Sequence, residues 1–329
     1  MAYTGDQQQQ PPPPPVGDAA EAASETRERQ RKDDEDARKR DEEKRKHEEE
    51  AARERTMNEY AERPSPDLTA EERRRAREAA SLDARTTHRV IREAGEKELT
   101  RGASALAWSG IAAGLSMGLS MAAEGMLRAR LPDAPWRPLV AKLGYSAGFL
   151  AVILGSQQLF TENTLTPVVP YLSKNSETKL SHVLRLWGIV LVANLVGTFL
   201  FALAASKTAV FPPELRGAFA AIGTETVVGP FWSTFARAVG AGWIVALMVW
   251  MLPDSKDARF WVIIVMAYII GAANLSHIVA GSAEAFYVVL TGAVGWSAFF
   301  ADFFLPTLLG NVVGGTTLVA ALNHGQVEG

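Results

Sequence analysis

The chain has 329 residues, 47% hydrophobic and 22% charged, with a mean hydropathy of +0.00. That average hides a division, because residues 1–100 carry 26 Asp and Glu and 21 Lys and Arg, which leaves 11 and 13 for residues 101–329. A single water-soluble domain does not segregate charge in this way. The net charges of −5 and +2 for the two parts do not indicate a nucleic-acid-binding protein. Cysteine is absent, which excludes disulfides, thiolate catalysis and Cys-ligated metals.

The first part of the chain is predicted to be a polar extension over residues 1–66. Residues 7–10 are all Gln and residues 11–15 are all Pro, a composition that favours extended polyproline II and cannot build a core. Residues 21–63 consist mostly of charged residues and Ala, without Leu, Ile, Val, Phe or Trp. Such a segment either forms a solvated helix with i,i+4 ion pairs or stays disordered, and it offers no apolar seam for a coiled coil.

A second segment, residues 67–101, is predicted to be a cytoplasmic amphipathic helix that packs under the apolar part of the chain. The sequence Thr69-Ala-Glu-Glu72 has the spacing of a capping box. The apolar positions Leu82, Val90 and Ile91 supply a sparse apolar face.

Six apolar stretches are long enough to cross a bilayer, which takes about 20 residues. They are residues 102–123, 139–160, 186–206, 238–253 with an extension back towards 227, 260–283 and 303–323. A buried soluble bundle would need polar outward faces, which these stretches lack. We therefore predict an all-α membrane domain over residues 102–324. Gly110, Gly114 and Gly118 lie on one face of the first stretch, where another helix can approach closely.

The distribution of basic residues favours a cytoplasmic N-terminus. Nine Lys and Arg flank the predicted inner ends of the spans, and six flank the outer ends. With six spans the C-terminus is then cytoplasmic as well.

The spans form two copies of a three-span unit. Polar breaks interrupt the second span at residues 160–164 and the fifth at 274–277. The third and sixth spans carry matching motifs, Asn194-Leu-Val-Gly197 and Asn311-Val-Val-Gly314. An odd number of spans in each copy inverts the second copy, and paired breaks in inverted halves mark a transport site at mid-membrane depth.

His277 is the single histidine within the spans, and an ionisable group at that depth is costly and usually functional. The alternative is a histidine whose ring is satisfied by a neighbouring carbonyl. We expect Glu162 and Glu284 to cap half-helices with their carboxylates. For Arg237 two positions stay open, at the membrane interface or facing a vestibule.

The motifs resemble those of the formate/nitrite transporter family. Ala141-Lys-Leu-Gly144 followed by Leu159-Phe-Thr-Glu-Asn-Thr164 is similar to the family's second-span signature. The two Asn-x-x-Gly motifs resemble its third- and sixth-span motifs, and Val90-Ile-Arg-Glu-Ala-Gly95 resembles its N-terminal helix. The resemblance covers about residues 88–323, so the long N-terminal extension lies outside it.

The resemblance implies an aquaporin-like fold of six helices as an inverted 3+3 repeat, with helices two and five broken, assembled as a homopentamer with one pore per protomer. It implies small monovalent weak-acid anions as substrates, such as formate, nitrite and hydrosulfide. The central histidine is His277 and the loop threonine is Thr161. The full set of expected pore residues is His277, Thr161, Asn163, Phe149, Leu159, Phe160 and Ile270, and the structural motif residues are Asn194, Gly197, Asn311 and Gly314.

The chain also departs from the family pattern. Gly281 stands where the family has an asparagine four residues after the histidine, and Ala246 replaces a fourth-span asparagine. The family's vestibule lysine has no counterpart, since that position falls near Pro230.

Two classes of function are compatible with these features. The first is passive or proton-coupled transport of weak-acid anions across a lipid bilayer, with localisation in a bacterial cytoplasmic (inner) membrane. The second is a non-conducting scaffold whose charged tail recruits a cytosolic partner. No nucleophile–base motif, metal-ligand cluster or phosphate loop is present, so we expect neither an enzyme, a bound metal nor a cofactor.

Overall fold

The computed structural model describes residues 82–173 and 178–321, with the isolated positions 31, 38, 41, 42, 44, 45, 69, 71, 72 and 325. The chain divides into two units, Met1–Ala80 and Ser81–Gly329. Apart from those isolated positions, the extension predicted over residues 1–66 lies outside the described residues. In the first unit the predicted capping box is confirmed. The Thr69 N–H donates to Glu72 Oε2 (2.8 Å), and the Glu72 N–H donates to Thr69 Oγ1 (3.2 Å).

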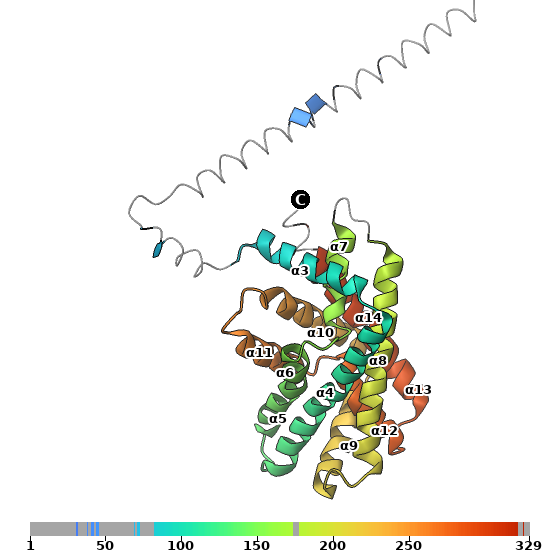
Figure 1. The fold of residues 1–329 in the computed structure, drawn as a ribbon. Helices are drawn as coiled ribbons and strands as arrows, with labels where there is room; N and C mark the ends of the chain where they lie inside the picture. The colour runs from blue at the N-terminus through green and yellow to red at the C-terminus, as the bar shows by residue number, and fades with distance from the viewer. Residues whose placement is uncertain are drawn as a thin grey trace, which may run out of the picture. The chain divides into compact units, whose positions relative to one another are not determined.

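The second unit is built of helices, labelled as in Figure 1. They are α3 (Ala84–Thr100), α4 (Ala103–Arg130), α5 (Arg137–Ala141), η1 (Lys142–Tyr145), α6 (Ser146–Leu154), η2 (Glu162–Thr164), α7 (Val168–Leu172), α8 (Leu180–Lys207), α9 (Pro213–Val227), α10 (Phe231–Met251), α11 (Arg259–Ala272), α12 (Ile278–Leu290), α13 (Trp296–Ala298), η3 (Phe299–Phe304), α14 (Leu305–Val313) and η4 (Gly314–Ala321).

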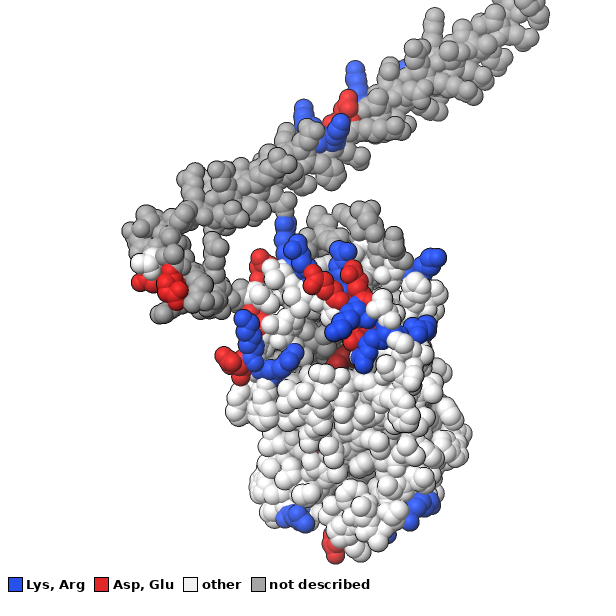
Figure 2. Space-filling view, viewed as in Figure 1, with Lys and Arg blue, Asp and Glu red and all other residues white. Residues whose placement is uncertain are grey.

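This unit has the surface of an integral membrane domain. Five helical stretches among the described residues are long and apolar enough to cross a membrane: α4, Arg137–Leu154, α8, α10 and Trp296–Thr317. The fifth predicted span is divided into the shorter apolar helices α11 and α12. In Figure 2 the charged side chains of this unit gather at its two ends, with an uncharged belt between them. Trp108, Trp232 and Trp261 are each more than 60% exposed, which suits lipid rather than water.

Two helix pairs, α4 with α8 and α10 with α14, pack through glycines. Gly114 and Gly197 face each other, so a Cβ added to either would lie 2.8 Å from the Cα of the other. Gly242 on α10 lies equally close to the Asn311 Cα of α14. The predicted close approach along the glycines of the first span is confirmed, and α8 is the helix that fills it.

The helices α6 and α11 end in the same way. Helix α11 ends at Ala272, next to the break predicted at residues 274–277, whereas α6 ends at Leu154, six residues before the break predicted at 160–164. Ser156 and Asn274 adopt the left-handed conformation, with φ of 51° and 50°. After each helix one N–H bonds five residues back, from Gln157 to Val152 (3.0 Å) and from Leu275 to Ile270 (2.9 Å). These are Schellman-type ends, which satisfy carbonyls that a terminated helix leaves free.

The segments after the two breaks differ from the expected pair of half-helices. After the second break α12 runs for 13 residues. After the first break the chain forms only the three-residue η2 and the five-residue α7. Pro167 is the N-cap of α7 and separates it from η2, because proline has no N–H to donate and disrupts the preceding turn of a helix.

The helix predicted over residues 67–101 is not continuous, because it is interrupted before α3; residues 73–81 lie outside the described residues. Leu82 and Asp83 are not helical, and Asp83 is the N-cap, whose Oδ1 accepts the Thr86 N–H (2.6 Å). This hydrogen bond lowers the pKa of the Asp83 carboxyl. Ile91 is buried as expected, but Val90 is exposed, so the apolar face of α3 is narrower than the sequence suggested.

The glycine packing yields a matched test on α8. A Cβ at Gly197 would lie 2.7 Å from the Leu115 N, whereas nothing lies within 4 Å of the Cβ position at Gly188. We expect Gly197→Ala to destabilise the protein by about 1–3 kcal/mol through overpacking against backbone. Gly188→Ala should be neutral or slightly stabilising. Thermal unfolding in detergent measures both, and equal melting temperatures would contradict this packing.

Candidate functional site

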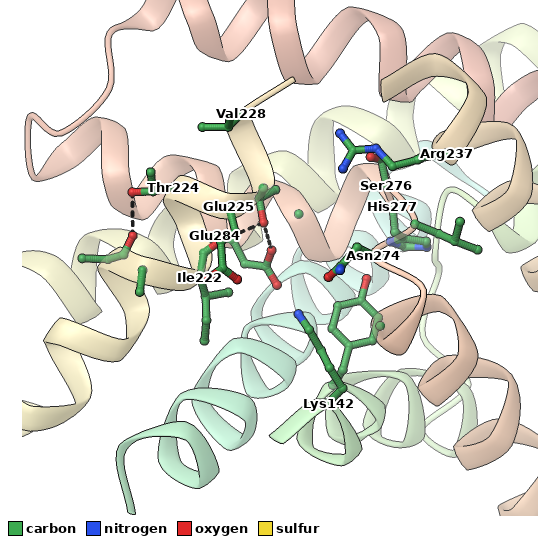
Figure 3. A pocket seen from close by; sticks show the side chains of 17 residues that line it. Lys142, Ile222, Thr224, Glu225, Val228, Arg237, Asn274, Ser276, His277 and Glu284 are labelled. Carbon is green, nitrogen blue, oxygen red and sulfur yellow. Dashed lines mark hydrogen bonds between the residues drawn. The ribbon is translucent and has the colours of Figure 1, made fainter. Parts of the chain in front are cut away.

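A cavity of about 740 Å³ opens within the second unit, lined by residues of η1, α9, α10, α11 and α12 and by the segment between α11 and α12 (Figure 3). His277 lines it together with Ser276 and Asn274, which belong to the same break. Lys142, Glu225 and Glu284 line it from other elements. The cavity therefore connects a broken helix with a group of charged side chains.

Thr161 and His277 meet although they are 116 residues apart. Thr161 Oγ1 lies 2.8 Å from His277 Nε2, and both side chains are buried. His277 is also the N-cap of α12, where its Nδ1 accepts the Ala280 N–H (3.1 Å). Because Nδ1 acts as an acceptor, a neutral imidazole carries its proton on Nε2 and donates it to Thr161 Oγ1.

Asn194 holds the first break in place. Its Nδ2 donates to the carbonyl oxygens of Gly110 (2.8 Å) and Gln158 (2.8 Å). Its Oδ1 accepts the Phe160 N–H (2.9 Å). One side chain thus ties the non-helical segment to α4 and α8 and satisfies three backbone groups in the core.

Asn311 repeats this pattern at the second break. Its Nδ2 donates to the carbonyl oxygens of Ala238 (2.8 Å) and Ser276 (2.9 Å), and its Oδ1 accepts the Ile278 N–H (2.8 Å). Both asparagines are fully buried. The two motifs found in the sequence therefore act as equivalent clamps, one for each break.

Thr161 lies 33 residues before Asn194 and His277 lies 34 before Asn311, a spacing that predicts equivalent positions for the two residues. The hydrogen bonds correct this register. Since Phe160 and Ile278 are the equivalent donors, Leu159 corresponds to His277, and Thr161 corresponds to Val279. Thr161 thus lies one residue after Phe160, whose N–H is bound by Asn194, whereas His277 lies one residue before the equivalent Ile278. Thr161 and His277 are therefore not equivalent positions of the two segments, although their side chains are in contact.

The aromatic and aliphatic residues expected in the pore are buried around this pair. Phe149 packs edge-on against the His277 ring, with centroids 5.0 Å apart. Leu159 and Ile270 are fully buried, and Phe160 packs against Trp187 at 6.0 Å.

Asn163, in contrast, uses its amide inside its own loop. Its Nδ2 donates to Gln158 Oε1 and to the Leu159 carbonyl oxygen, each at 3.0 Å. Of the seven expected pore residues only His277 lines the cavity; the other six do not, namely Thr161, Asn163, Phe149, Leu159, Phe160 and Ile270.

The expectations for the two glutamates are wrong, because neither caps a helix. The N-cap of α12 is His277, and Glu284 lies in the seventh position of that helix, where Thr226 donates to it. Glu162 Oε1 is buried without a hydrogen-bond partner. Arg237 was expected either at the membrane interface or facing a vestibule, and in the structure it lines the cavity.

Gly281 has a steric explanation. A Cβ at this position would lie 2.7 Å from the Phe303 ring, so that aromatic side chain occupies the space of any larger residue.

A cluster of charged residues beside the cavity was not predicted. Lys142 pairs with the buried Glu124 (2.6 Å), and Arg128 pairs with Glu225 (2.5 Å). Glu124 lies just past the first uncharged stretch, and Lys142 is the single charge within the second. A lysine within a span requires a partner, and that signal could have led to Glu124.

This architecture defines an integral membrane protein with a cavity that is lined in part by a histidine held in a helix break. A family model described as "Formate/nitrite transporter" matches residues 85–325, most of the described chain. The chain therefore belongs to the formate/nitrite transporter family, which comprises transporters and channels rather than enzymes.

Individual relatives support the assignment. The inner membrane protein YfdC of Escherichia coli (strain K12) is 44% identical over 241 residues, covering 73% of this chain and 78% of YfdC. A probable formate transporter of Methanothermobacter thermautotrophicus is 30% identical over 216 residues, covering 60% of this chain and 78% of the relative.

Two solved structures share the fold. A pentameric formate channel with formate bound superposes with a TM-score of 0.56 at 23% identity, covering 70% of this chain and 96% of the channel. An ion channel of the same family superposes with a TM-score of 0.59 at 20% identity, covering 72% and 94%.

The equivalent clamps predict equivalent losses. Asn194→Ala and Asn311→Ala each leave two carbonyls and one N–H without a partner in the core, so each should cost about 3 kcal/mol or more of stability. Asn311→Asp keeps the acceptor for the Ile278 N–H and should therefore be less destabilising than Asn311→Ala. Melting temperatures in detergent measure the series, and an Asn194→Ala protein as stable as the parent would contradict the clamp.

Proposed function

We propose that this protein conducts small monovalent weak-acid anions, such as formate or nitrite, through a pore in each protomer that passes Thr161 and His277. Membership of the formate/nitrite transporter family supports the proposal, as does the cavity that His277 lines. The observation that carries it is the hydrogen bond between Thr161 and His277, because it brings two polar side chains together among apolar ones, between the two breaks.

An anion that leaves water for a narrow apolar passage loses hydration, which is prohibitive for an isolated charge. The Thr161 hydroxyl oxygen accepts a hydrogen bond from His277 Nε2–H, so the hydroxyl hydrogen of Thr161 is free to point at an anion. Among the described residues this hydroxyl has no other hydrogen-bond partner. The N-terminus of α12 adds a partial positive charge at the same depth. Thr161 is therefore the direct donor in this scheme, and His277 orients it.

The apolar side chains around the pair would exclude water and other ions. Phe149 stacks edge-on against His277, and Leu159 and Ile270 are fully buried nearby in the same core. Hydrophobic constrictions of this kind restrict permeation to species whose charge is stabilised or neutralised.

The role of His277 is better supported as hydrogen-bond donor than as proton donor. Its Nδ1 lone pair accepts the Ala280 N–H at the start of α12. Protonation of Nδ1 would convert this acceptor into a donor and break the helix cap. A proton that travels with the anion must then be held elsewhere.

The wider assembly belongs to the proposal. Six spans as an inverted 3+3 repeat, with α11 and α12 as the two halves of the fifth, are supported by the equivalent asparagine clamps. A homopentamer in a bacterial inner membrane is suggested by the pentameric formate channel and by YfdC. A non-conducting scaffold is the alternative, and the same flux measurement tests it.

The first test separates chemistry from helix capping at His277. His277→Asn retains a side chain that favours the N-cap position but removes the imidazole. We expect it to assemble normally and to lose at least tenfold in formate flux into proteoliposomes. His277→Phe should lose the flux and the cap together. Thr161→Ala removes the direct donor and should lose at least as much flux as His277→Asn.

Stopped-flow flux of formate, nitrite and acetate at two pH values gives the readout, with size-exclusion profiles as the control for assembly. Unchanged flux in well-assembled His277→Asn protein would leave the imidazole a packing residue. Absence of flux for every anion in the parent protein would favour the scaffold.

The second test addresses topology, for which this Cys-free chain is suited. Single cysteines at residues 60 and 327 should be labelled only after the membrane is permeabilised. A cysteine at Ala209, an exposed position between α8 and α9, should react with an impermeant maleimide in intact cells. Labelling of residue 60 or 327 in intact cells would overturn the cytoplasmic placement of both termini.

A further inference from the structure

Five charged side chains from four elements meet beside the cavity. Glu124 and Arg128 lie on α4, Lys142 on η1, Glu225 on α9 and Glu284 on α12. Glu124 pairs with Lys142 (2.6 Å), and the Glu225 carboxylate accepts hydrogen bonds from both terminal nitrogens of Arg128 (2.5 and 2.9 Å). Figure 3 shows the Lys142 amine directed towards Glu225 and Glu284. The group holds three carboxylates but two cations. Arg237 on α10 is a further cation in the lining of the cavity, but it donates to Thr234 Oγ1 (3.3 Å) and forms no ion pair with these carboxylates.

Glu284 is the carboxylate left without a cation of its own. Thr226 donates to its Oε2, while its Oε1 is buried without a hydrogen-bond partner. The residue is 4% exposed and lines the cavity. A buried carboxylate in this situation is normally neutralised by a bound proton or cation.

We propose that Glu284 is a proton-binding site in the cavity wall and that it supplies the proton which accompanies the anion. The carboxylic acid gives its proton to an oxygen of the entering anion, so that one O–H bond breaks at Glu284 and one forms on the anion. A proton from the water of the cavity then restores the acid. The binding of the proton stands on the geometry alone, whereas its delivery rests on the proposed function.

The position of Glu284 suits this step. It lies seven residues after His277, which is close to two full turns, so both side chains are on the same face of α12. Gly281 lies between them on that face and also lines the cavity. His277 holds its Nδ1 lone pair in the helix cap and is therefore poorly placed to take up a second proton.

The surroundings of Glu284 determine whether it binds the proton. Glu124, Glu225 and Lys142 interact with it electrostatically, and the hydroxyl of Thr226 bonds to it. Tyr145 on η1 and His277 on α12 line the same cavity as uncharged groups. The two carboxylates favour the neutral acid, and Lys142, which opposes it, is already engaged with Glu124.

Infrared difference spectroscopy of the full-length protein in lipid tests the site without any transport. A pH step should reveal the carbonyl stretch of a protonated carboxyl group, which disappears as the pH rises. We expect Glu284→Gln to lose this band. Glu214→Gln, which alters an exposed glutamate on α9, should keep it. Glu284→Asp should also keep a carboxyl band, with a shifted midpoint, and it serves if the Gln variant does not fold.

The outcomes decide the proposal. A band that survives unchanged in folded Glu284→Gln protein places the proton on another carboxyl, such as Glu124 or Glu162, and overturns it. A parent protein whose band is abolished by Na⁺ at constant pH would make the site a cation site instead.

Flux measurements address the delivery step separately. In proteoliposomes Glu284→Gln should conduct formate more slowly than the parent at low pH, because the donor is gone, and its remaining flux should no longer depend on the pH at the cavity side. Retained pH dependence in this variant would overturn the delivery step. If the parent conducts no anion, the proposed function fails, while the infrared result still decides the proton site.

Discussion

The arrangement of this protein depends on satisfying the backbone where two helices stop inside a membrane domain. Lipid offers no hydrogen bonds, and each unsatisfied group costs several kcal/mol. Schellman-type ends at Ser156 and Asn274 close the terminated helices, and one asparagine then satisfies three backbone groups around each break. Because Asn194 and Asn311 are themselves anchored on α8 and α14, the depth of each break is fixed by helix packing. The meeting of Thr161 with His277 is a consequence of these two clamps.

The same hydrogen bond that caps α12 also sets the chemistry of His277. An imidazole free in a pore titrates near pH ~6.5 and exchanges protons readily. Here its Nδ1 accepts the Ala280 N–H, so the proton is confined to Nε2 and directed at Thr161. Stability of the helix and the identity of the tautomer are thus linked. A histidine in this position can donate a hydrogen bond continuously without changing its charge.

The local signals in the sequence predicted much of this. Polar or small residues placed within apolar runs predicted the breaks and the asparagines and glycines of the two motifs. They also predicted the importance of Thr161 and His277. The charged cluster did not follow, because its pairs join distant positions; Arg128 and Glu225 are 97 residues apart. Helix α9 escaped notice because it is short and less apolar than the spans. The register between the two breaks was wrong, because Thr161 follows its clamped residue by one position and His277 precedes its own by one. Only the hydrogen bonds of the asparagines define this difference.

The two halves share a backbone frame but differ in the side chains placed on it. Leu159 occupies the position of His277, and Val279 occupies that of Thr161, so each half contributes one polar residue and one apolar residue. Only the second break leads directly into a long helix, since Pro167 separates η2 from the five-residue α7. The partial positive charge of a helix N-terminus is therefore supplied from one side alone. A frame with near symmetry thereby produces a site with two unlike faces, and the cavity with Glu284 in its wall lies on the side that α12 provides.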